Sequence, residues 1–368
     1  MHPKIGLVAP SLDILGGQGV QACALMDCLA TEAYEVAFIP INPRFPSRLQ
    51  WVRRLRGART ALNESLYASS LARLQHVDVV HVFCASYWSF LLAPVPAILA
   101  ARILGKRVIL NYHSGEAEDH LAHWGPLVHP WLRLVDEIVV PSEYLREVFA
   151  RHGYRVRVIP NVIDTLGLRY RERSPLRPRL LSARNLERHY GVDVILTAFA
   201  LIKHRYPDAT LIVAGYGREE RALRRLAAAL GVDGISFVGR QEPLEMAALY
   251  AGADVFVNAS VVDNQPLSVL EAFAAGLPVV STSTGDLKNM IGRGGHMPVS
   301  PRTTTFVRGD SGLIVPCGDP AAIAAAVAAL LEDPDSALAM VRRARQKVDA
   351  YTWPYVREAW AATYESGV

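Results

Sequence analysis

The feature that most limits the fold of this chain is a regular alternation of short apolar runs with helix-length segments. The runs are almost continuously apolar, which is typical of parallel strands buried on both faces. The first half contains KIGLVAP, EVAFIPI, VDVVHVF, RVILNYH, DEIVVPS and RVRVIPN, and the second half contains RLLSAR, ATLIVAG, ISFVG, DVFVNAS, PVVSTS and GLIVP. Strands that alternate with helices in this way predict an α/β protein built from doubly wound sheets.

One break in the pattern divides the chain. Residues 169–179, RYRERSPLRPR, are basic, contain two prolines and lack an apolar period, which predicts a linker. A length of 368 residues suits two domains. We therefore expect Rossmann-like domains at 1–168 and 180–353, and a final helix at 354–368 that packs back on the first domain. Ligands bind at the carboxyl ends of such strands, so the expected site is a cleft where the two domains face each other.

Composition limits the class of protein. Apolar residues make up 51% of the chain, charged residues 20%, and the net charge is +4, so nothing favours a nucleic-acid partner. The four cysteines form no C-x-x-C pair, which argues for reduced thiols and against a disulfide or zinc framework. The N-terminus lacks a signal-peptide pattern, so we expect a cytoplasmic protein. The uncharged stretch 82–101 is interrupted by Pro94 and Pro96, which favours a buried strand, loop and helix over a membrane span.

The segment DNQPLSVLEAFAAGLPVVS, residues 263–281, contains an acidic side chain within an apolar helix. Asp263 or Asn264 suits the N-cap, with Pro266 in the first turn. In one interpretation Asp263 is only a cap and Glu271 faces solvent. The helix has no polar stripe, however, and a buried carboxylate is costly unless it is hydrogen-bonded. We therefore expect Glu271 to bind a sugar or ribose hydroxyl, beside a phosphate at the helix N-terminus.

Two glycine-rich turns follow predicted strands. LGGQGVQA, residues 15–22, leads into a helix, and LIVAGYGREE, residues 211–220, has a similar strand–glycine–helix order. Such turns let backbone NH groups approach a phosphate, but a loop that merely needs glycine looks the same. No acid that could bind a ribose follows the second strand, which counts against a nicotinamide dehydrogenase.

On these residues the chain resembles the family 4 retaining glycosyltransferases of GT-B architecture. The family carries an E-x7-E arrangement followed by EA-x-A-x-G-x-PV, which reads here as Asp263-x7-Glu271 and then AFAAGLPVVST. The resemblance extends over nearly the whole chain, through GGQG, NYHSGE, VIPNVID, ARNLERHYGVD, LIVAGYG, FVGR, ADVFVNAS and GLIVPCGDP. The acidic motif is specific, whereas the glycine turns are not.

The resemblance implies an enzyme that moves a sugar from a nucleoside diphosphate donor, a UDP- or GDP-sugar, to an acceptor hydroxyl with retention of configuration. The donor is a substrate, and no metal or other cofactor is expected. Glu271 would bind the ribose, and Asp263 would contact the transferred sugar. Arg184 would stabilise charge on the departing diphosphate. The backbone at Leu267 and Ser268 would face that diphosphate. Further implied positions are His113, a catalytic residue beside the sugar, and the donor contacts Gly16, Gly17, Arg188, Gly215 and Asn264.

This chain departs from the family pattern at three places. Tyr190 stands where the family usually has a lysine, and Arg188 or His189 is the candidate for the missing charge. Gly285-Asp286 replaces a Gly-Gly pair, and the loop 292–309 is longer than usual, which indicates either a functional or a disordered segment. A sugar-nucleotide epimerase and an idle nucleotide-sugar binder therefore remain as alternatives.

Two further clusters have competing interpretations. His113, Glu116, His120 and His123 lie close in sequence but match no metal-binding spacing, which favours surface side chains over a metal site. An arginine-rich stretch includes Trp51 and Leu55, and it is either a solvated face or an interfacial segment that meets anionic lipid and brings the enzyme to a membrane-bound acceptor. Its arginines are Arg44, Arg48, Arg53, Arg54, Arg56 and Arg59.

Overall fold

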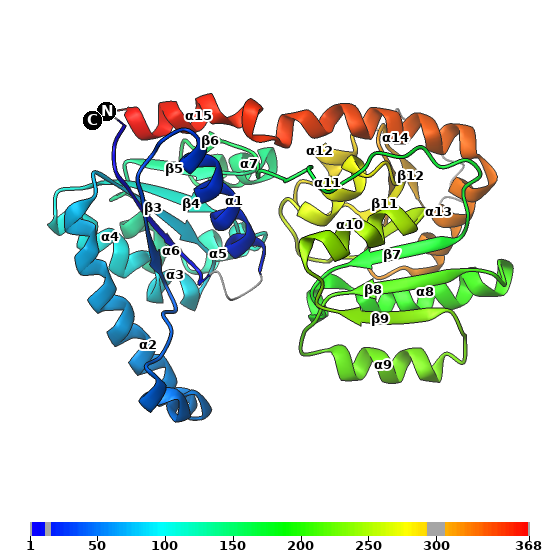
Figure 1. Cartoon of the computed structure of the whole chain (residues 1–368), viewed down its shortest axis with the longest axis horizontal. Coiled ribbons are helices and arrows are strands. Elements are labelled where there is room, and N and C mark those ends of the chain that lie inside the picture. The colour runs from blue at the N-terminus through cyan, green and yellow to red at the C-terminus, as the bar shows by residue number, and fades with distance from the viewer. Residues whose placement is uncertain (1, 12–15, 293–305, 367–368) are drawn as a thin grey trace. The chain divides into compact units, whose positions relative to one another are not determined.

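The computed structural model describes residues 2–11, 16–292 and 306–366, without the side chains of Arg53 and Arg56. The chain forms two compact units, Met1–Val162 with Trp353–Val368, and Ile163–Thr352 (Figure 1). Most of the loop 292–309, and the start of the first glycine turn at 12–15, lie outside the described residues. None of the described helices is long and apolar enough to cross a membrane.

Within its described residues, the first unit contains a six-stranded sheet in the order β2-β1-β3-β4-β5-β6, and each neighbouring pair is parallel. This arrangement confirms the expected doubly wound topology. The strands are β1 (Ile5–Ala9), β2 (Val36–Pro40), β3 (Val79–Cys84), β4 (Arg107–Tyr112), β5 (Glu137–Val140) and β6 (Arg157–Val158). The helices are α1 (Gly17–Thr31), η1 (Ser47–Arg54), α2 (Arg56–Leu71), η2 (Ala72–His76), α3 (Trp88–Leu92), α4 (Pro94–Ile103), α5 (Ala117–His123), α6 (Gly125–Leu132), α7 (Glu143–Arg151) and α15 (Trp353–Glu365).

Both faces of the first sheet are covered, which explains why its strands are so continuously apolar. In β3, Val80 and Val82 face one core, and Val79 and Phe83 face another. The second core also includes Trp360 and two other side chains of α15, so the C-terminal helix is part of this unit. Tyr364 Oη lies 2.8 Å from the buried Nδ1 of His81.

The second unit contains, within its described residues, a seven-stranded sheet in the order β12-β13-β11-β10-β7-β8-β9. The strands are β7 (Arg179–Ala183), β8 (Thr210–Ala214), β9 (Ile235–Gly239), β10 (Val255–Asn258), β11 (Val279–Thr282), β12 (Val307–Arg308) and β13 (Leu313–Val315). The helices are η3 (Arg188–Tyr190), α8 (Val192–Arg205), α9 (Glu220–Ala229), α10 (Pro243–Gly252), α11 (Leu267–Ala274), α12 (Leu287–Ile291), α13 (Pro320–Glu332), α14 (Pro334–Val348) and η4 (Asp349–Tyr351). β12, a short edge strand that the sequence does not predict, pairs antiparallel with β13.

The segment 169–179 belongs to the second unit, which differs from the expected linker. Its Arg173 is 4% exposed, and its guanidinium donates to the carbonyls of Tyr250 and Ala253, where α10 ends, and of Ala275 and Gly276, where α11 ends. The last carbonyls of a helix have no intrahelical partner and carry partial negative charge, so a buried cation satisfies them. The basic composition that resembles a linker therefore includes an arginine that anchors two helices.

Candidate functional site

Three neighbouring strands of the second sheet position the predicted site residues. β10, β7 and β8 are adjacent and parallel, so their carboxyl ends meet at one edge of the sheet. Arg184 follows β7, Gly215 follows β8, and the turn with Asp263 follows β10. This is the edge at which parallel α/β sheets bind ligands.

Asp263 lies in the turn after β10 and does not cap α11, although the sequence suits it to that role. The N-cap of α11 is Pro266, with no side-chain cap, so neither Asp263 nor Asn264 caps the helix. Asp263 Oδ1 instead accepts from the backbone NH of Asn264 at 2.9 Å, and Oδ2 accepts from Arg184 Nη2 at 2.5 Å. Gly285 lies behind this turn with φ +56°, where a Cβ would stand 2.2 Å from the carbonyl oxygen of Asp263.

Arg184 is the centre of the arrangement. Its side chain is 10% exposed and that of Asp263 is 11% exposed, so the two form a largely buried ion pair. A second guanidinium nitrogen, Nη1, donates to Ser268 Oγ at 3.3 Å, while the buried Nε has no hydrogen-bond partner among the described residues. The guanidinium carbon lies 4.2 Å from the ring centre of Tyr190, which is a cation–π distance. The chain therefore fixes one cation beside the start of α11.

The backbone at Arg184 explains the glycine at 215. Arg184 NH donates to the carbonyl of Ala214 at 3.0 Å, which continues the pairing of β7 with β8. Gly215 then adopts φ +137°, and a Cβ there would lie 1.9 Å from the carbonyl oxygen of Arg184. Gly215 is thus required for the close approach of the two strand ends that fixes Arg184, a role that needs no contact with a ligand.

Glu271 has an internal partner that the sequence does not reveal. Tyr250 Oη, on α10, lies 2.7 Å from Glu271 Oε2 and 3.2 Å from the carbonyl oxygen of Ser268. Burial raises the pKa of Glu271 above its ordinary value of 4.5, and the hydrogen bond from Tyr250 and the charge of Arg184 partly oppose the rise. From the sequence, the Glu271 carboxylate is expected to need a ligand hydroxyl to offset its burial. Tyr250 already supplies a hydrogen bond, so the carboxylate does not by itself require a ligand. Its Oε1 has no hydrogen-bond partner in the described part of the chain.

The remaining predicted residues of the second unit lie near this centre in sequence. Leu267 and Ser268 occupy the first turn of α11, where backbone NH groups have no intrahelical acceptor. Arg188 is exposed in η3, the short helix that also contains Tyr190.

Three of the predicted residues, Gly16, Gly17 and His113, lie in the first unit. Gly16 is the N-cap of α1, and a Cβ on Gly16 or Gly17 would meet no atom of the described residues within 4 Å. His113 follows β4 and stacks on Phe83 at 5.1 Å between ring centres. Burial lowers the pKa of His113 to about 3, so the imidazole is neutral at physiological pH.

Comparison with known proteins identifies the family. The model of glycosyltransferase family 4 matches residues 15–165, and the model of glycosyl transferases group 1 matches residues 171–347. The GDP-mannose-dependent alpha-(1-6)-phosphatidylinositol monomannoside mannosyltransferase of Mycobacterium tuberculosis is 30% identical over 293 residues, which cover 72% of this chain and 71% of that protein. The chain belongs to glycosyltransferase family 4.

Other relatives agree with this assignment. The glycogen synthase of the same organism is 29% identical over 303 residues, 78% of this chain and 68% of that enzyme. The structure of Anabaena HepE in complex with UDP and glucose aligns with a TM-score of 0.73 at 16% identity, over 99% of this chain and 100% of HepE. The fold is GT-B, and the protein is a glycosyltransferase.

Tyr190, which stands where the family resemblance implies a lysine, has a structural role. Tyr190 supplies no charge, and its ring instead packs against the guanidinium of Arg184. His189 neighbours the Tyr190 ring at 4.1 Å, and its carbonyl accepts from Val261 NH. The Tyr190 ring therefore supports the guanidinium of Arg184.

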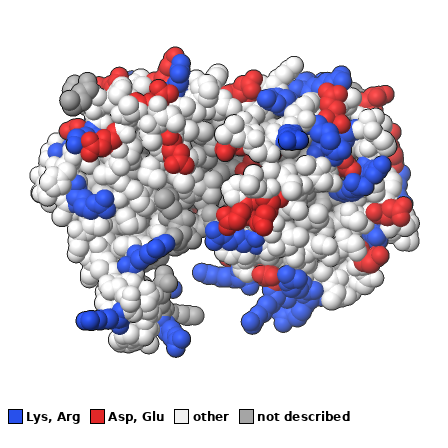
Figure 2. Space-filling model, viewed as in Figure 1, with Lys and Arg blue, Asp and Glu red and all other residues white. Residues whose placement is uncertain are grey.

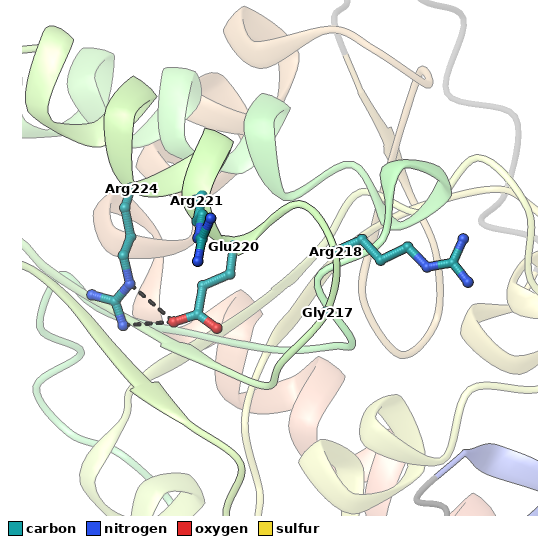
Figure 3. Close-up of a pocket in the computed structure, with 5 residues that line it drawn as sticks. All are labelled: Gly217, Arg218, Glu220, Arg221 and Arg224. Carbon is teal, nitrogen blue, oxygen red and sulfur yellow. Dashed lines mark hydrogen bonds and ion pairs between the residues drawn. The ribbon is translucent and has the colours of Figure 1, made fainter. Parts of the chain in front are cut away.

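A hollow of about 550 Å³ lies at the turn that links β8 to α9 (Figure 3). It is lined by Gly217, Arg218, Glu220, Arg221 and Arg224. Glu220 pairs with Arg224 at 2.9 Å. None of the predicted site residues lines this hollow, so it is separate from the Arg184 site.

The side chains of the sequence cluster His113, Glu116, His120 and His123 do not point to one common site. His120 Nδ1 lies 2.8 Å from Tyr112 Oη in the core, whereas His123 is exposed and lies 2.9 Å from Asp119. Among the described residues, no group of three or more histidine, cysteine or acidic side chains could hold a metal ion.

The arginine-rich stretch forms η1 and the first turn of α2, far from the first sheet in Figure 1. Separate Lys and Arg side chains stand among uncharged residues at this end of the unit (Figure 2). Trp51 is 61% exposed and Leu55 50% exposed, while Val52 between them is buried. We call this region, residues 44–59, the basic surface.

Proposed function

We propose that the protein is a retaining glycosyltransferase that moves a sugar from a UDP- or GDP-sugar to a hydroxyl of a lipid-linked, polysaccharide or small-molecule acceptor. The observation that carries the proposal is Arg184, a cation held between Asp263 and Tyr190 at the start of α11. A fixed cation and a helix N-terminus offer preorganised charge to a departing diphosphate, which is the term that usually dominates such catalysis.

Each predicted residue has a role in this proposal. The NH groups of Leu267 and Ser268 and the guanidinium of Arg184 receive the diphosphate. Glu271 binds the ribose through Oε1, while Oε2 keeps its bond with Tyr250. Asp263 contacts the transferred sugar near its reacting carbon. The further donor contacts are Gly16, Gly17, Arg188, Gly215 and Asn264, and the neutral His113 lies beside the sugar.

The chemistry needs no separate general base. As the bond from the anomeric carbon to the diphosphate breaks, the acceptor oxygen bonds to the same face of that carbon. Its proton passes to the departing phosphate oxygen. Arg184 is most effective at this moment, because negative charge grows on that phosphate as the bond lengthens.

The test is a panel of UDP-, GDP- and ADP-sugars, scored for thermal stabilisation and for nucleotide release, in wild type and Glu271→Ala. We expect one donor to stabilise the protein and to be turned over slowly by water, and Glu271→Ala to abolish both effects. Glu358→Ala, a change of an exposed carboxylate on α15, serves as the matched control. Binding without release would favour the idle binder, donor isomerisation would favour the epimerase, and failure to bind any donor would refute all three.

The basic surface supports a location at the cytoplasmic face of a membrane, with an acceptor in the lipid. Exposed arginines beside an exposed tryptophan suit an anionic lipid surface, to which each arginine contributes about 1 kcal/mol. Two relatives carry names that include a lipid acceptor, the mannosyltransferase above and the alpha-monoglucosyldiacylglycerol synthase of Streptococcus pneumoniae.

Sedimentation with vesicles tests this part of the proposal. We expect binding to phosphatidylglycerol vesicles and not to phosphatidylcholine vesicles. Arg54→Gln with Arg59→Gln should weaken binding roughly 30-fold, because two contributions of about 1 kcal/mol are lost. Arg357→Gln, an exposed arginine on α15, is the control. Equal binding to both lipids would show that the basic surface is only a solvated face.

A further inference from the structure

The turn that follows β3 has a strained backbone at a residue that is not glycine. Tyr87 adopts φ +56° and ψ −133°, a region that residues with a side chain rarely occupy. Such conformations cost about 1–3 kcal/mol and persist only where their surroundings enforce them, which occurs most often at ligand sites. The turn also stands at the carboxyl end of a central parallel strand, where α/β sheets bind ligands.

Contacts with α5, the helix that follows β4, and with its C-cap Trp124 hold Tyr87 in this conformation. Its hydroxyl donates to Asp119 Oδ2 at 2.6 Å, and its ring meets the edges of the His120 and Trp124 rings at 5.3 and 5.6 Å. The preceding Ser86 donates to Ser114 Oγ, which follows β4. The ends of β3 and β4 are thus tied together around one aromatic side chain.

The strained turn sets Trp88 out into solvent. Its side chain is 67% exposed, and its indole stands perpendicular to that of Trp124, with ring centres 5.3 Å apart. Two carboxylates accompany these rings, because Asp119 is bonded to Tyr87 and Glu116 is the N-cap of α5, the helix that carries Asp119. The Trp88 indole packs edge-on against Trp124 and yet stays largely exposed, and exposed aromatic patches commonly mark binding sites.

We propose that Trp88, Trp124 and Tyr87, with Asp119 and Glu116, form a platform that binds the sugar or polyol ring of the acceptor. A pyranose has an apolar face of CH groups that covers an indole, and hydroxyls at its rim that donate to carboxylates. The two acids would repel an anionic lipid headgroup or a phosphate, so the occupant is an uncharged ring and the platform differs in kind from the basic surface. This inference rests on the proposed function and names the acceptor class for it.

Ligand-observed NMR on the full chain tests the platform with methyl α-glucopyranoside, methyl α-mannopyranoside and myo-inositol as probes. We expect at least one probe to bind with a roughly millimolar Kd and Trp88→Ala to weaken it about tenfold, the effect of about 1.4 kcal/mol of ring contact. Trp88→Phe should recover part of the affinity, because it restores an aromatic face. Tyr355→Ala, which removes another ring that is 66% exposed, should bind as wild type does.

Donor hydrolysis, measured as nucleotide release into water in the same samples, separates the platform from the proposed function. We expect Trp88→Ala to hydrolyse donor at the wild-type rate, because water replaces the acceptor. The platform is overturned if wild type binds none of the probes, if Trp88→Ala binds them equally, or if Trp88→Ala changes only self-association, which would make this face a contact between copies. If wild type hydrolyses none of the donors, the transferase proposal would be overturned instead.

Discussion

The guanidinium of Arg184 and the carboxylate of Asp263 meet at 2.5 Å, each only about a tenth exposed, at the carboxyl ends of two adjacent strands. The pair brings together residues that are far apart in sequence. Both partners must be present, because removal of one leaves the other charge buried without compensation.

Removal of Arg184 should therefore impair both catalysis and folding. Arg184→Met should lower donor turnover at least about 100-fold, because the cation beside the diphosphate is lost. It should also lower the free energy of unfolding by about 3 kcal/mol, measured in urea, because Asp263 then stays buried alone. The double variant Arg184→Met with Asp263→Leu should regain stability without activity. Unchanged stability in Arg184→Met would contradict the ion pair as described.

Tyr190 should act through Arg184. Tyr190→Phe keeps the ring under the guanidinium, so we expect nearly full donor turnover. Tyr190→Ala removes that support and should lower kcat/KM for the donor about tenfold, a loss near 1.4 kcal/mol. Steady-state kinetics with the donor found in the panel would measure both. An equal loss in Tyr190→Phe and Tyr190→Ala would assign the role to the hydroxyl and reject the stacking account.

Much of this arrangement is encoded in local patterns, and some of it is not. The apolar runs predict the parallel strands because each strand is covered on both faces, and the spacing of Asp263 and Glu271 marks α11 as unusual. Tyr250 is missed because it comes from a neighbouring helix, and nothing local distinguishes its hydroxyl from others. The role of Arg173 is missed for a related reason. A basic stretch with prolines resembles a solvated linker, and only the fold places the carbonyls at the ends of α10 and α11 around the Arg173 guanidinium.

Arg173 should be a major contributor to the stability of the second unit. Burial lowers the pKa of its guanidinium to about 10, so it remains charged at neutral pH and binds four helix-end carbonyls. Arg173→Ala should lower the free energy of unfolding by about 3 kcal/mol, because those carbonyls lose their buried donor and the nearby Asp254 loses one of its arginine partners. Arg169→Ala, an exposed arginine of the same segment, is the control in urea denaturation. Equal midpoints for the two variants would restore the linker interpretation.

The glycines at 215 and 16 should respond differently to a methyl group. Gly215→Ala forces a Cβ to within 1.9 Å of the Arg184 carbonyl oxygen and should lower the free energy of unfolding by at least about 2 kcal/mol. In Gly16→Ala the added methyl group meets no atom within 4 Å in the part of the chain that the structure describes, so the thermal midpoint should stay near that of wild type. If Gly16 admits the donor as proposed, Gly16→Ala should still raise the KM for the donor. Wild-type KM in Gly16→Ala would remove that residue from the donor site.

Glu271 should make the protein less stable as the pH rises above 4.5. Its pKa is raised in the folded state, so between 4.5 and that raised value the folded chain binds more protons than the unfolded chain, and stability falls with increasing pH. Glu271→Gln keeps an acceptor for Tyr250 but has no proton to lose, so it should flatten this part of the profile and gain most relative to wild type near pH 7. Urea midpoints between pH 4 and 8 for wild type, Glu271→Gln and the exposed control Glu358→Gln would measure it. A parallel profile for wild type and Glu271→Gln would mean that Glu271 keeps its ordinary pKa on folding, and its burial would then be offset by the bond from Tyr250.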